Sequence, residues 1–545
     1  MTRERAVMSP GHQDHVHADR RRTRARAALS ALVALSMLTA AAVFDRPASA
    51  GLLGGLLCPV TNTLGNVVSA GWDDGATTPP TTLTQVEQAI GATQLHASGI
   101  DGSGIGVAVI DSGVVPVQGL NGSGKVINGP DLSFESQSAG TRYLDTYGHG
   151  THMAGIIAGN DGPGGSFQGV APGAHLVVLK VATYAGLDDV SQMLAAIDWV
   201  VQHRNDPGMN IRVLNLSFGT RSLQSYQVDP IAFAVENAWR HGIVTVVSGG
   251  NDGTSFGSLR DPGVDPYVLS VGAADLHATN LLGCTTVAPF SSRSWSRSVD
   301  VVSPGVSIAS LRDPSSAIDL AHPGAVVDTR FFRGSGTSQA AAVVSGAVAL
   351  VLQARPSLTP DQVKALLRST SASLALLDGS AEGSGFINVG AAATAWVPWG
   401  STQGWAKATG TGSLDQARGG SYVTANGVAL TGEQDIMGKP WVGATWAKAA
   451  AGGSAWTAGS WNGATWAGAC WCGTSWAGTT TWSGGQWSGG QWSGGQWSGG
   501  QWSGGQWSGG QWSGGQWSGG QWSGGQWSGG QWSGGQWSGG QWSSG

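Results

Sequence analysis

Short apolar runs alternate with segments of helical hydrophobic spacing between residues 83 and 395, and this alternation predicts the fold of that region. Apolar side chains recur at helical intervals over residues 190–201 and 231–239. An alternation of strands and helices is typical of a mostly parallel sheet with right-handed crossovers and with helices on both faces. We therefore expect an α/β domain of three layers. The strands expected in its sheet are residues 104–111, 175–181, 211–218, 243–247, 267–271 and 299–302.

A glycine-rich turn at residues 333–337 leads into an almost wholly apolar helix that runs to Leu352. Ser338 stands at the amino end of this helix, where the helix dipole and the free N–H groups favour negative charge. An activated serine needs such surroundings, because its alkoxide and the oxyanion that it generates must be stabilised. A serine that only caps a core helix would have the same local sequence, so the polar residues upstream decide the interpretation of Ser338.

Two polar residues upstream have complementary chemistry. Asp111 ends the apolar run 104–111, and the carboxyl ends of parallel strands form the ligand crevice of open α/β sheets. His149 opens another helix of small and apolar residues. Taken alone, Asp111 is better explained as a turn cap and His149 as a structural residue. Together with Ser338 they supply an orienting carboxylate, a base and a nucleophile.

The order of these three residues along the chain distinguishes between the known arrangements of serine hydrolases. Asp111, His149 and Ser338 follow the order of subtilisin, which differs from the order in chymotrypsin and in the α/β-hydrolases. A β-rich run between the histidine and the serine ends in Asn251, a suitable oxyanion donor. The sequence resembles the subtilisin-like serine proteases over roughly residues 83–395. The matching motifs are Val-Ile-Asp-Ser-Gly at 109–113, His-Gly-Thr-His at 149–152, Asn-Leu-Ser-Phe-Gly at 215–219, Gly-Asn-Asp-Gly at 250–253 and Gly-Thr-Ser at 336–338.

The resemblance implies a subtilisin-like fold, a serine endopeptidase activity and a role for each matching polar residue. Asp111 would accept the ring N–H of His149, and His149 would take the proton of Ser338 as that hydroxyl attacks a peptide carbonyl. The side-chain amide of Asn251 and the backbone N–H of Ser338 would hold the oxyanion. The substrates would accordingly be polypeptides, and no cofactor is required for the chemistry.

The resemblance also indicates where substrate lies. Phe218 is equally well explained as a core aromatic of its strand. The sequence departs from the commonest family pattern after the serine, where Gln339 and Ala342 replace the usual Met and Pro. The residues expected to contact substrate are Ser217, Phe218, Gly219, Gly249 and Gly250.

The family pattern places Arg260 near the floor of the primary specificity pocket, where a guanidinium favours an acidic or amide side chain before the scissile bond. The alternative is a surface arginine paired with Asp261. No zinc site is predicted, because His149 and His152 are three residues apart and lack a third ligand of suitable spacing. The resemblance implies structural calcium without indicating its ligands.

Residues 1–50 have the pattern of a secretory signal peptide. A basic segment at 20–26 precedes an apolar run at 27–44 and an Ala-Ser-Ala cleavage site at 48–50. No later run reads as a membrane span, so we expect a secreted protein without a transmembrane anchor once the signal is removed. The formal net charge of −5 argues against nucleic-acid binding.

Residues 51–82 are expected to be a short pro-segment or linker before a catalytic domain at 83–395. If Cys58 is removed with this segment, few partners remain for the other cysteines, because the two in the tail are separated by a single residue. Cys284 is therefore expected to be a free thiol.

The composition changes abruptly after about residue 395. Residues 396–440 are expected to be a linker, and residues 441–545 a low-complexity tail in which Trp recurs at every fifth position from Trp482 to Trp542, in Ser-Gly-Gly-Gln-Trp repeats. A period of five fits neither an amphipathic helix nor an alternating strand. Three interpretations remain open: a flexible tail, an aromatic array that binds cell-wall glycan or another insoluble surface, and a regular β-stack.

Two functions from different classes follow from these patterns. The favoured one is a secreted serine endopeptidase with an appended repeat tail. The alternative is a surface adhesin or cell-wall-binding scaffold whose protease-like domain is weakly active or processes the chain itself. The complete triad and Asn251 favour the first function, and the short pro-segment and the long Trp-rich tail favour the second.

Overall fold

The structure is a computed structural model. It describes residues 70–545 except 77, 138–139, 254–258, 278–281, 295–296, 375–378, 426–427 and 437, and beyond Trp456 it describes only the backbone of short strands. The expected signal peptide at residues 1–50 and the following residues 51–69 lie outside the described part.

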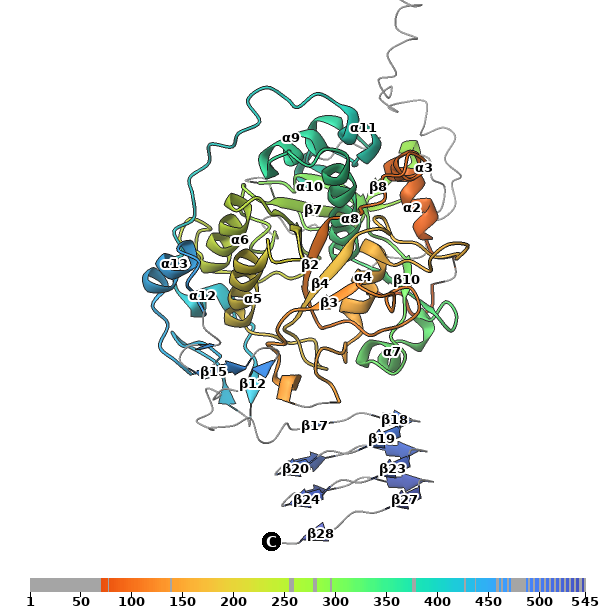
Figure 1. The fold of residues 1–545 in the computed structure, drawn as a ribbon, viewed down its shortest axis with the longest axis vertical. Coiled ribbons are helices and arrows are strands. Elements are labelled where there is room, and N and C mark those ends of the chain that lie inside the picture. The colour runs from red at the N-terminus through yellow and green to blue at the C-terminus, as the bar shows by residue number, and fades with distance from the viewer. Residues whose placement is uncertain are drawn as a thin grey trace, which may run out of the picture. The chain divides into compact units, whose positions relative to one another are not determined.

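An eight-stranded sheet forms the centre of the catalytic region (Figure 1). Its strands are β2 (Gly106–Asp111), β3 (Val126–Asn128), β4 (His175–Lys180), β5 (Ile211–Leu216), β6 (Val244–Ser248), β7 (Leu269–Asp275), β8 (Thr286–Val287) and β9 (Val301–Pro304). The order is β3-β4-β2-β5-β6-β7-β8, with β9 also paired to β7, and every pair except β7 with β8 is parallel. The central strands β2, β5 and β6 are buried on both faces, which explains their nearly continuous apolar sequences.

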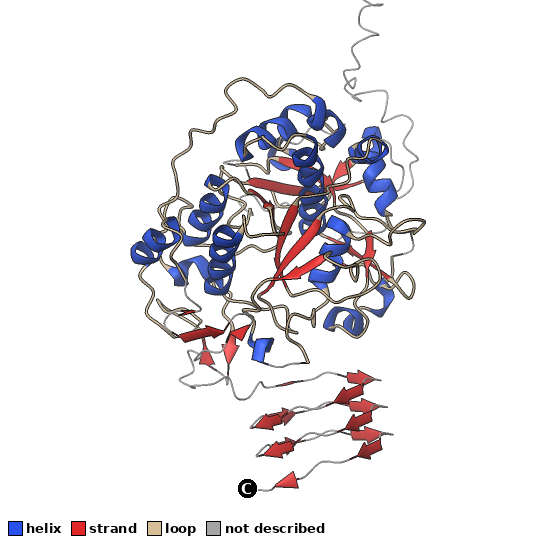
Figure 2. Ribbon diagram, in the orientation of Figure 1, coloured by secondary structure: helices blue, strands red, loops and turns tan. Residues whose placement is uncertain are grey.

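Helices cover both faces of this sheet (Figure 2). On one face, α4 (His149–Ala158) packs against α8 (Thr337–Ala354), and α8 runs along β5, β6 and β7. On the other face, α5 (Val190–His203) and α6 (Pro230–Arg240) pack together against β2 and β6. The predicted three-layer α/β arrangement is therefore confirmed. The remaining helices of this region are α2 (Leu83–Ile90), α3 (Ala92–Ala97), α7 (Ala317–Ala321), α9 (Pro360–Thr370), α10 (Gly379–Glu382) and α11 (Val389–Thr394).

Helix α8 is long and apolar enough to cross a membrane by length and composition, and it alone meets that criterion among the residues described. Within the fold, however, 83% of its apolar window is buried. A core helix passes the same test as a membrane span. The apolar sequence of α8 is explained by its packing against three strands and α4.

A second sheet carries the chain toward Ser338. It has three antiparallel strands in the order β1-β11-β10, namely β1 (Gly71–Trp72), β11 (Phe331–Ser335) and β10 (Ile308–Leu311). Strand β1 belongs to the segment expected to be a pro-segment or linker. Residues 70–82, which we call the N-terminal strap, are not an unattached linker, because they pair with the strand that precedes Ser338. Their removal as a pro-segment stays a prediction.

The chain after the catalytic region also packs onto it. This part contains α12 (Leu414–Arg418), β12 (Thr424–Ala425), β13 (Val428–Ala429) and α13 (Gly443–Ala451). The Arg418 side chain has no solvent exposure and pairs with buried Asp189, with Nε 2.6 Å from Oδ2. Trp441 and Trp446 are buried as well. The structure therefore corrects both the linker at 396–440 and the tail boundary at 441, and we call residues 396–456 the C-terminal strap.

The repeats form parallel backbone pairs. Strand β17 (Trp487–Ser488) is followed by β18 to β27, each Gln-Trp-Ser and starting every five residues from Gln491 to Gln536, and by β28 (Trp542–Ser543). Each strand from β17 to β24 pairs with the strand 20 residues later, so that Trp492 is in register with Trp512. This backbone matches the regular β-stack, while binding to a surface stays a prediction. Three strands precede this array: β14 (Ser460–Trp461), β15 (Ala464–Ala467) and β16 (Cys470–Trp471).

Cys284 lies between β7 and β8 and is buried. It is disulfide-bonded, so the expectation of a free thiol was wrong. The expectation failed because the spacing of cysteines along a chain does not report which of them meet in space.

Candidate active site

The three candidate triad residues stand at the ends of three elements. Asp111 is the last residue of β2, His149 the first of α4 and Ser338 the second of α8. Gly150 allows α4 to start close to β2, because a Cβ there would lie 2.2 Å from the carbonyl oxygen of Gly113. The missing side chain at Gly150 therefore brings His149 within reach of Asp111.

His149 and Asp111 form the expected hydrogen-bonded pair. Nδ1 of His149 lies 2.8 Å from Oδ1 and 2.9 Å from Oδ2 of Asp111. Burial by itself would lower the pKa of His149, but the charge of Asp111 and its hydrogen bond raise it above its ordinary value. With Nδ1 turned to the carboxylate, Nε2 is the nitrogen that would take up a proton.

Ser338 is held at the start of α8 by reciprocal bonds with Ser217. The Ser338 hydroxyl donates to the carbonyl oxygen of Ser217 at 3.4 Å, and the Ser217 hydroxyl donates to the carbonyl oxygen of Ser338 at 3.3 Å. Among the described hydrogen bonds, none joins Ser338 to His149. Catalytic hydrogen bonds are often long or misaligned until substrate binds. If Ser338 acts as the expected nucleophile, its hydroxyl would have to turn from Ser217 toward His149.

Asn251 lies beside the nucleophile with its side chain held by Thr337. Its Oδ1 accepts hydrogen bonds from the backbone N–H and the hydroxyl of Thr337, both at 2.9 Å, which leaves Nδ2 as a donor. A Cβ built on Gly336 would lie 3.6 Å from Asn251 Nδ2 and 3.7 Å from the backbone nitrogen of Ser338. Both N–H groups therefore border the same space, as the donors of an oxyanion hole must.

The residues expected to bind substrate follow two neighbouring strands. Ser217–Gly219 come directly after β5, and Gly249–Gly250 directly after β6, which pairs with β5 in parallel. Phe218 is half-buried against the hydrophobic core, in agreement with its alternative interpretation. A Cβ on Gly219 would lie 2.7 Å from the Cβ of Arg260, so Arg260 stands directly beside this segment.

The Arg260 guanidinium binds Asp252 through both Nε and Nη2, the latter at 2.7 Å from Oδ1. Arg221 donates to the same carboxylate at 2.7 Å. Burial opposes ionisation of Asp252, but the bonds from the two arginines hold its pKa below the ordinary value. The expected alternative, a pair of Arg260 with buried Asp261, is therefore wrong. Because Arg260 is already paired with Asp252, it gives less reason than the sequence indicated to expect a substrate with an acidic side chain before the scissile bond.

The comparison with known proteins identifies the family. The model of the subtilase family, peptidase S8, matches residues 102–412, which is more than half of the chain. The chain belongs to the subtilase family. This membership confirms the expected subtilisin-like fold of the catalytic region.

Two curated relatives and one solved structure show the extent of the similarity. The subtilase is 36% identical over 297 residues to serine protease AprX of Bacillus subtilis, covering 53% of this chain and 66% of AprX. It is 32% identical over 307 residues to Subtilisin DY of Bacillus licheniformis, covering 56% of this chain and 96% of that protein. Fervidolysin from Fervidobacterium pennivorans, a keratinolytic enzyme related to subtilisin, matches at 31% identity and a TM-score of 0.46, over 58% of this chain and 46% of its own. The subtilase therefore spans just under two thirds of AprX and less than half of fervidolysin.

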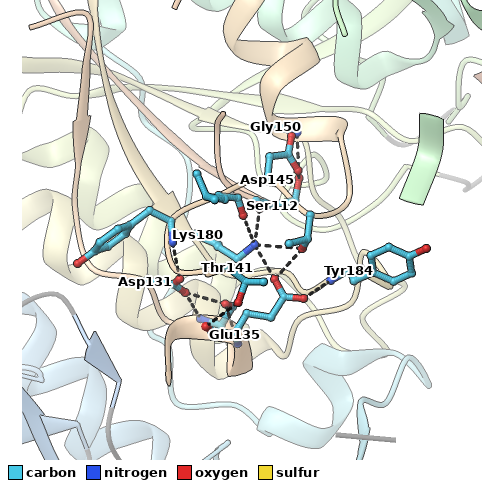
Figure 3. A network of polar contacts seen from close by, with 12 residues as sticks. Ser112, Asp131, Glu135, Thr141, Asp145, Gly150, Lys180 and Tyr184 are labelled. Carbon is cyan, nitrogen blue, oxygen red and sulfur yellow. Dashed lines mark hydrogen bonds and ion pairs between the residues drawn. The ribbon is translucent and has the colours of Figure 1, made fainter. Parts of the chain in front are cut away.

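A buried carboxylate behind the triad, Asp145, was not found from the sequence (Figure 3). Its Oδ1 accepts from the Ser112 hydroxyl at 2.7 Å and from the N–H of Gly148 at 2.6 Å, and its Oδ2 accepts from the N–H of Thr151 at 2.7 Å. Burial raises the pKa of Asp145, although these bonds oppose the rise. Ser112 also donates its N–H to Asp111 at 2.8 Å. Asp145 therefore ties the start of α4 to the loop after β2.

Lys180, the last residue of β4, was also missed. Its Nζ donates to the carbonyl oxygens of Ser112 at 2.9 Å and Leu144 at 2.5 Å and pairs with Glu135 at 2.9 Å (Figure 3). These bonds join the loop after Asp111 to the loop before α4. A lysine at the end of an otherwise apolar buried strand was the available signal, because such a charge is rarely buried without partners.

Metal ligands were not assigned from the sequence beyond an implied calcium. The described residues contain no group of three or more His, Cys, Asp or Glu side chains placed to hold a metal ion. His152 is buried within α4, and burial lowers its pKa to about 3, with a smaller effect from the charge of His149. Structural calcium therefore stays an expectation without a ligand set.

Proposed function

We propose that this subtilase is a secreted serine endopeptidase that cleaves peptide bonds with Asp111, His149 and Ser338. The observation that carries the proposal is the bond of His149 to Asp111 at 2.8 Å, at the start of a helix that packs against α8, the buried helix that carries Ser338 at its amino end. The relatives named serine protease AprX and Subtilisin DY support the same reaction. The signal-like pattern of residues 1–50 supports secretion.

In the proposed reaction, Ser338 Oγ forms a bond to the carbonyl carbon of the scissile peptide while His149 Nε2 takes its proton. The carbonyl electron pair moves to oxygen, and the resulting oxyanion accepts hydrogen bonds from Asn251 Nδ2 and the N–H of Ser338. Asp111 stabilises the imidazolium. His149 then gives the proton to the leaving amine as the C–N bond breaks, and a water molecule, deprotonated in turn by His149, hydrolyses the acyl-enzyme.

Labelling with a fluorophosphonate probe tests the proposal. We expect strong labelling of the wild type and none of Ser338→Ala, whose circular dichroism should be unchanged because Ser and Ala both suit a helix start. Ser421→Ala, which removes an exposed serine, is the matched control. Asn251→Ala should lower kcat by about 10²- to 10³-fold with little change in KM, because the donor acts in the transition state. Labelling that persists in Ser338→Ala would contradict the assignment.

For the tail we propose binding to cell-wall glycan or another insoluble surface. The register of the strands supports this role, because it aligns Trp492, Trp512 and Trp532 along one set of backbone pairs. Tryptophan combines a large apolar face with one N–H donor, as carbohydrate contacts require. Many linked weak contacts raise avidity without any single strong one.

A further inference from the structure

Trp72, in the N-terminal strap, contacts the helix that begins with His149 and the strand that leads toward Ser338. Its ring lies over Gly334 of β11, where a Cβ would be 2.7 Å from Trp72 Cζ3. The ring also meets His149 edge to face, with centroids 6.2 Å apart and planes at 81°. His152, one turn further along α4, has the same relation to Trp72 at 5.2 Å and 84°. The triad and the oxyanion donors leave these contacts unexplained.

Three consecutive residues of β11 bind the strap. Arg333 donates to two backbone carbonyl oxygens of the strap, at 3.0 and 2.8 Å. Gly334 pairs with Trp72 in antiparallel register. Ser335 donates its hydroxyl to the carboxylate of Asp73 at 2.9 Å. Because the nucleophile follows three residues later, the strap is fastened to the same stretch of chain that delivers the reactive serine.

The strap is fastened at two further places. Asp74 pairs with Nδ1 of His322 at 2.6 Å. Thr81 donates its N–H to the carbonyl oxygen of Ser307 at 2.8 Å and accepts the N–H of Ala309 at 2.9 Å, which extends the edge of β10. Trp72 is therefore held over Gly334 by its own backbone pairing and by the bonds of the strap residues that follow it.

We propose that residues 70–82 belong to the working catalytic domain and that Trp72 is a positioning residue for His149. The proposal rests on the protease function proposed above. The bond to Asp111 holds one edge of the imidazole, and the indole restrains the ring from a second direction. Through Gly334 the same indole is joined to the strand that leads to Ser338, so base and nucleophile share one support. Any cleavage that releases a leader must then lie before Gly71.

Substitution of Trp72 in the full chain tests this role. Trp72→Ala should lower kcat by about 10- to 100-fold with little change in KM, because small misplacements of a catalytic group cost this much. Trp72→Phe should restore most of the activity, since an aromatic edge remains beside His149. Trp399→Ala, which removes a fully exposed tryptophan, is the matched control and should have wild-type activity. Fluorophosphonate labelling of Trp72→Ala should slow in parallel with kcat.

The pH profile separates positioning of His149 from a simple loss of folded protein. Burial is the largest influence that lowers the pKa of His149, so removal of the indole should raise that pKa. Because the base acts when neutral, the acid limb of kcat/KM should move to higher pH in Trp72→Ala. Partial unfolding would lower the plateau value of kcat/KM and leave the pH of its acid limb unchanged. The titratable groups around His149 are Asp111, Asp145, Tyr147 and His152.

Several outcomes would overturn the proposal. Wild-type kcat and labelling rate in Trp72→Ala would do so, and so would a gain in activity, which would make the strap inhibitory. If Trp72→Ala does not fold, Trp72→Leu keeps most of the apolar volume without an aromatic edge and gives the same test. A wild type that is not labelled at Ser338 would refute the protease function itself, whereas a labelled wild type with an unaffected Trp72→Ala would refute only the positioning role.

Discussion

The N-terminal strap, residues 70–82, and the C-terminal strap, residues 396–456, both pack onto the catalytic region, but onto different parts of it. The first pairs with β11 and touches His149 through Trp72. The second packs against α5 and α6, the helices on the face of the sheet opposite α4 and α8. This difference predicts that changes in the first strap alter catalysis and that changes in the second alter stability.

The contacts of the C-terminal strap are centred on two buried carboxylates of the α5 region. Asp189 caps α5 by accepting the N–H of Ser191 at 2.9 Å and also pairs with Arg418 of the strap. Asp198, within α5, accepts the indole N–H groups of Trp446 at 2.9 Å and Trp456 at 2.8 Å. These anchors hold a helix that carries none of the proposed catalytic residues.

The largest expected effect concerns the buried ion pair. Arg418→Ala leaves Asp189 buried without its partner, which should lower the free energy of unfolding by about 3–5 kcal/mol. Urea denaturation measures this change, and kcat per fluorophosphonate-labelled site should stay at the wild-type value. Arg368→Ala, at a half-exposed arginine 3.9 Å from Asp300, is the control and should change stability little. A fall in kcat per labelled site of Arg418→Ala would contradict the prediction that the C-terminal strap affects stability and not catalysis.

A smaller effect on the free energy of unfolding is expected from the titration of Asp198. Burial raises its pKa to about 7, against an ordinary value of 3.8, although the bonds from Trp446 and Trp456 oppose the rise. The folded state therefore binds the proton more tightly than the unfolded state, so this contribution to stability is complete below about pH 4 and is lost as pH rises through 7.

Asp198→Asn should remove that part of the pH dependence, because the amide oxygen still accepts the indole N–H groups without ionising. Thermal unfolding between pH 5 and pH 8 is the measurement, expected to show a flatter stability curve for the variant. Asp206→Asn, at a carboxylate about half exposed, is the control. An equal slope in wild type and Asp198→Asn would show that another group is responsible.

The smallest effect on chemistry is expected from removal of the repeats. Deleting residues 457–545 should leave kcat/KM on a short peptide nearly unchanged, since the described catalytic contacts lie before this point. Deleting from 441 should destabilise the protein, because buried Asp198 loses the indole N–H donors Trp446 and Trp456. Retention on isolated cell wall should fall in steps as repeats are removed. Equal retention of full-length and truncated protein would refute the binding proposal.

The triad residues could be predicted because each stands at the end of an element with a strong local pattern. Asp111 ends an apolar run, and the strand observed, β2, ends at the same residue. His149 and Ser338 follow glycine-rich turns at the starts of apolar helices. Asp145 could not be predicted with the same methods, because an isolated polar residue carries no period and its importance depends on which backbone groups it meets. Lys180 gave one signal that was missed, a charge at the end of an apolar buried strand.

Local sequence was sufficient for β2, β4, β5, β6, β7 and β9 and for the helices α4, α5, α6 and α8, because burial on one or both faces imposes a period on neighbouring residues. The short strands β3 and β8 and the β1-β11-β10 sheet were not predicted. The two straps have no such period, and only the tertiary structure showed that they pack. Their glycines predicted linkers, but some of these glycines are required by the packing. A Cβ on Gly412 would lie 2.3 Å from Oε1 of Gln224, and a Cβ on Gly443 would lie 2.8 Å from the carbonyl oxygen of Gly410. A small residue that permits close approach and a small residue that permits flexibility look alike in a sequence. They differ only in whether a distant part of the chain, here nearly 200 residues away for Gly412, comes to lie against them.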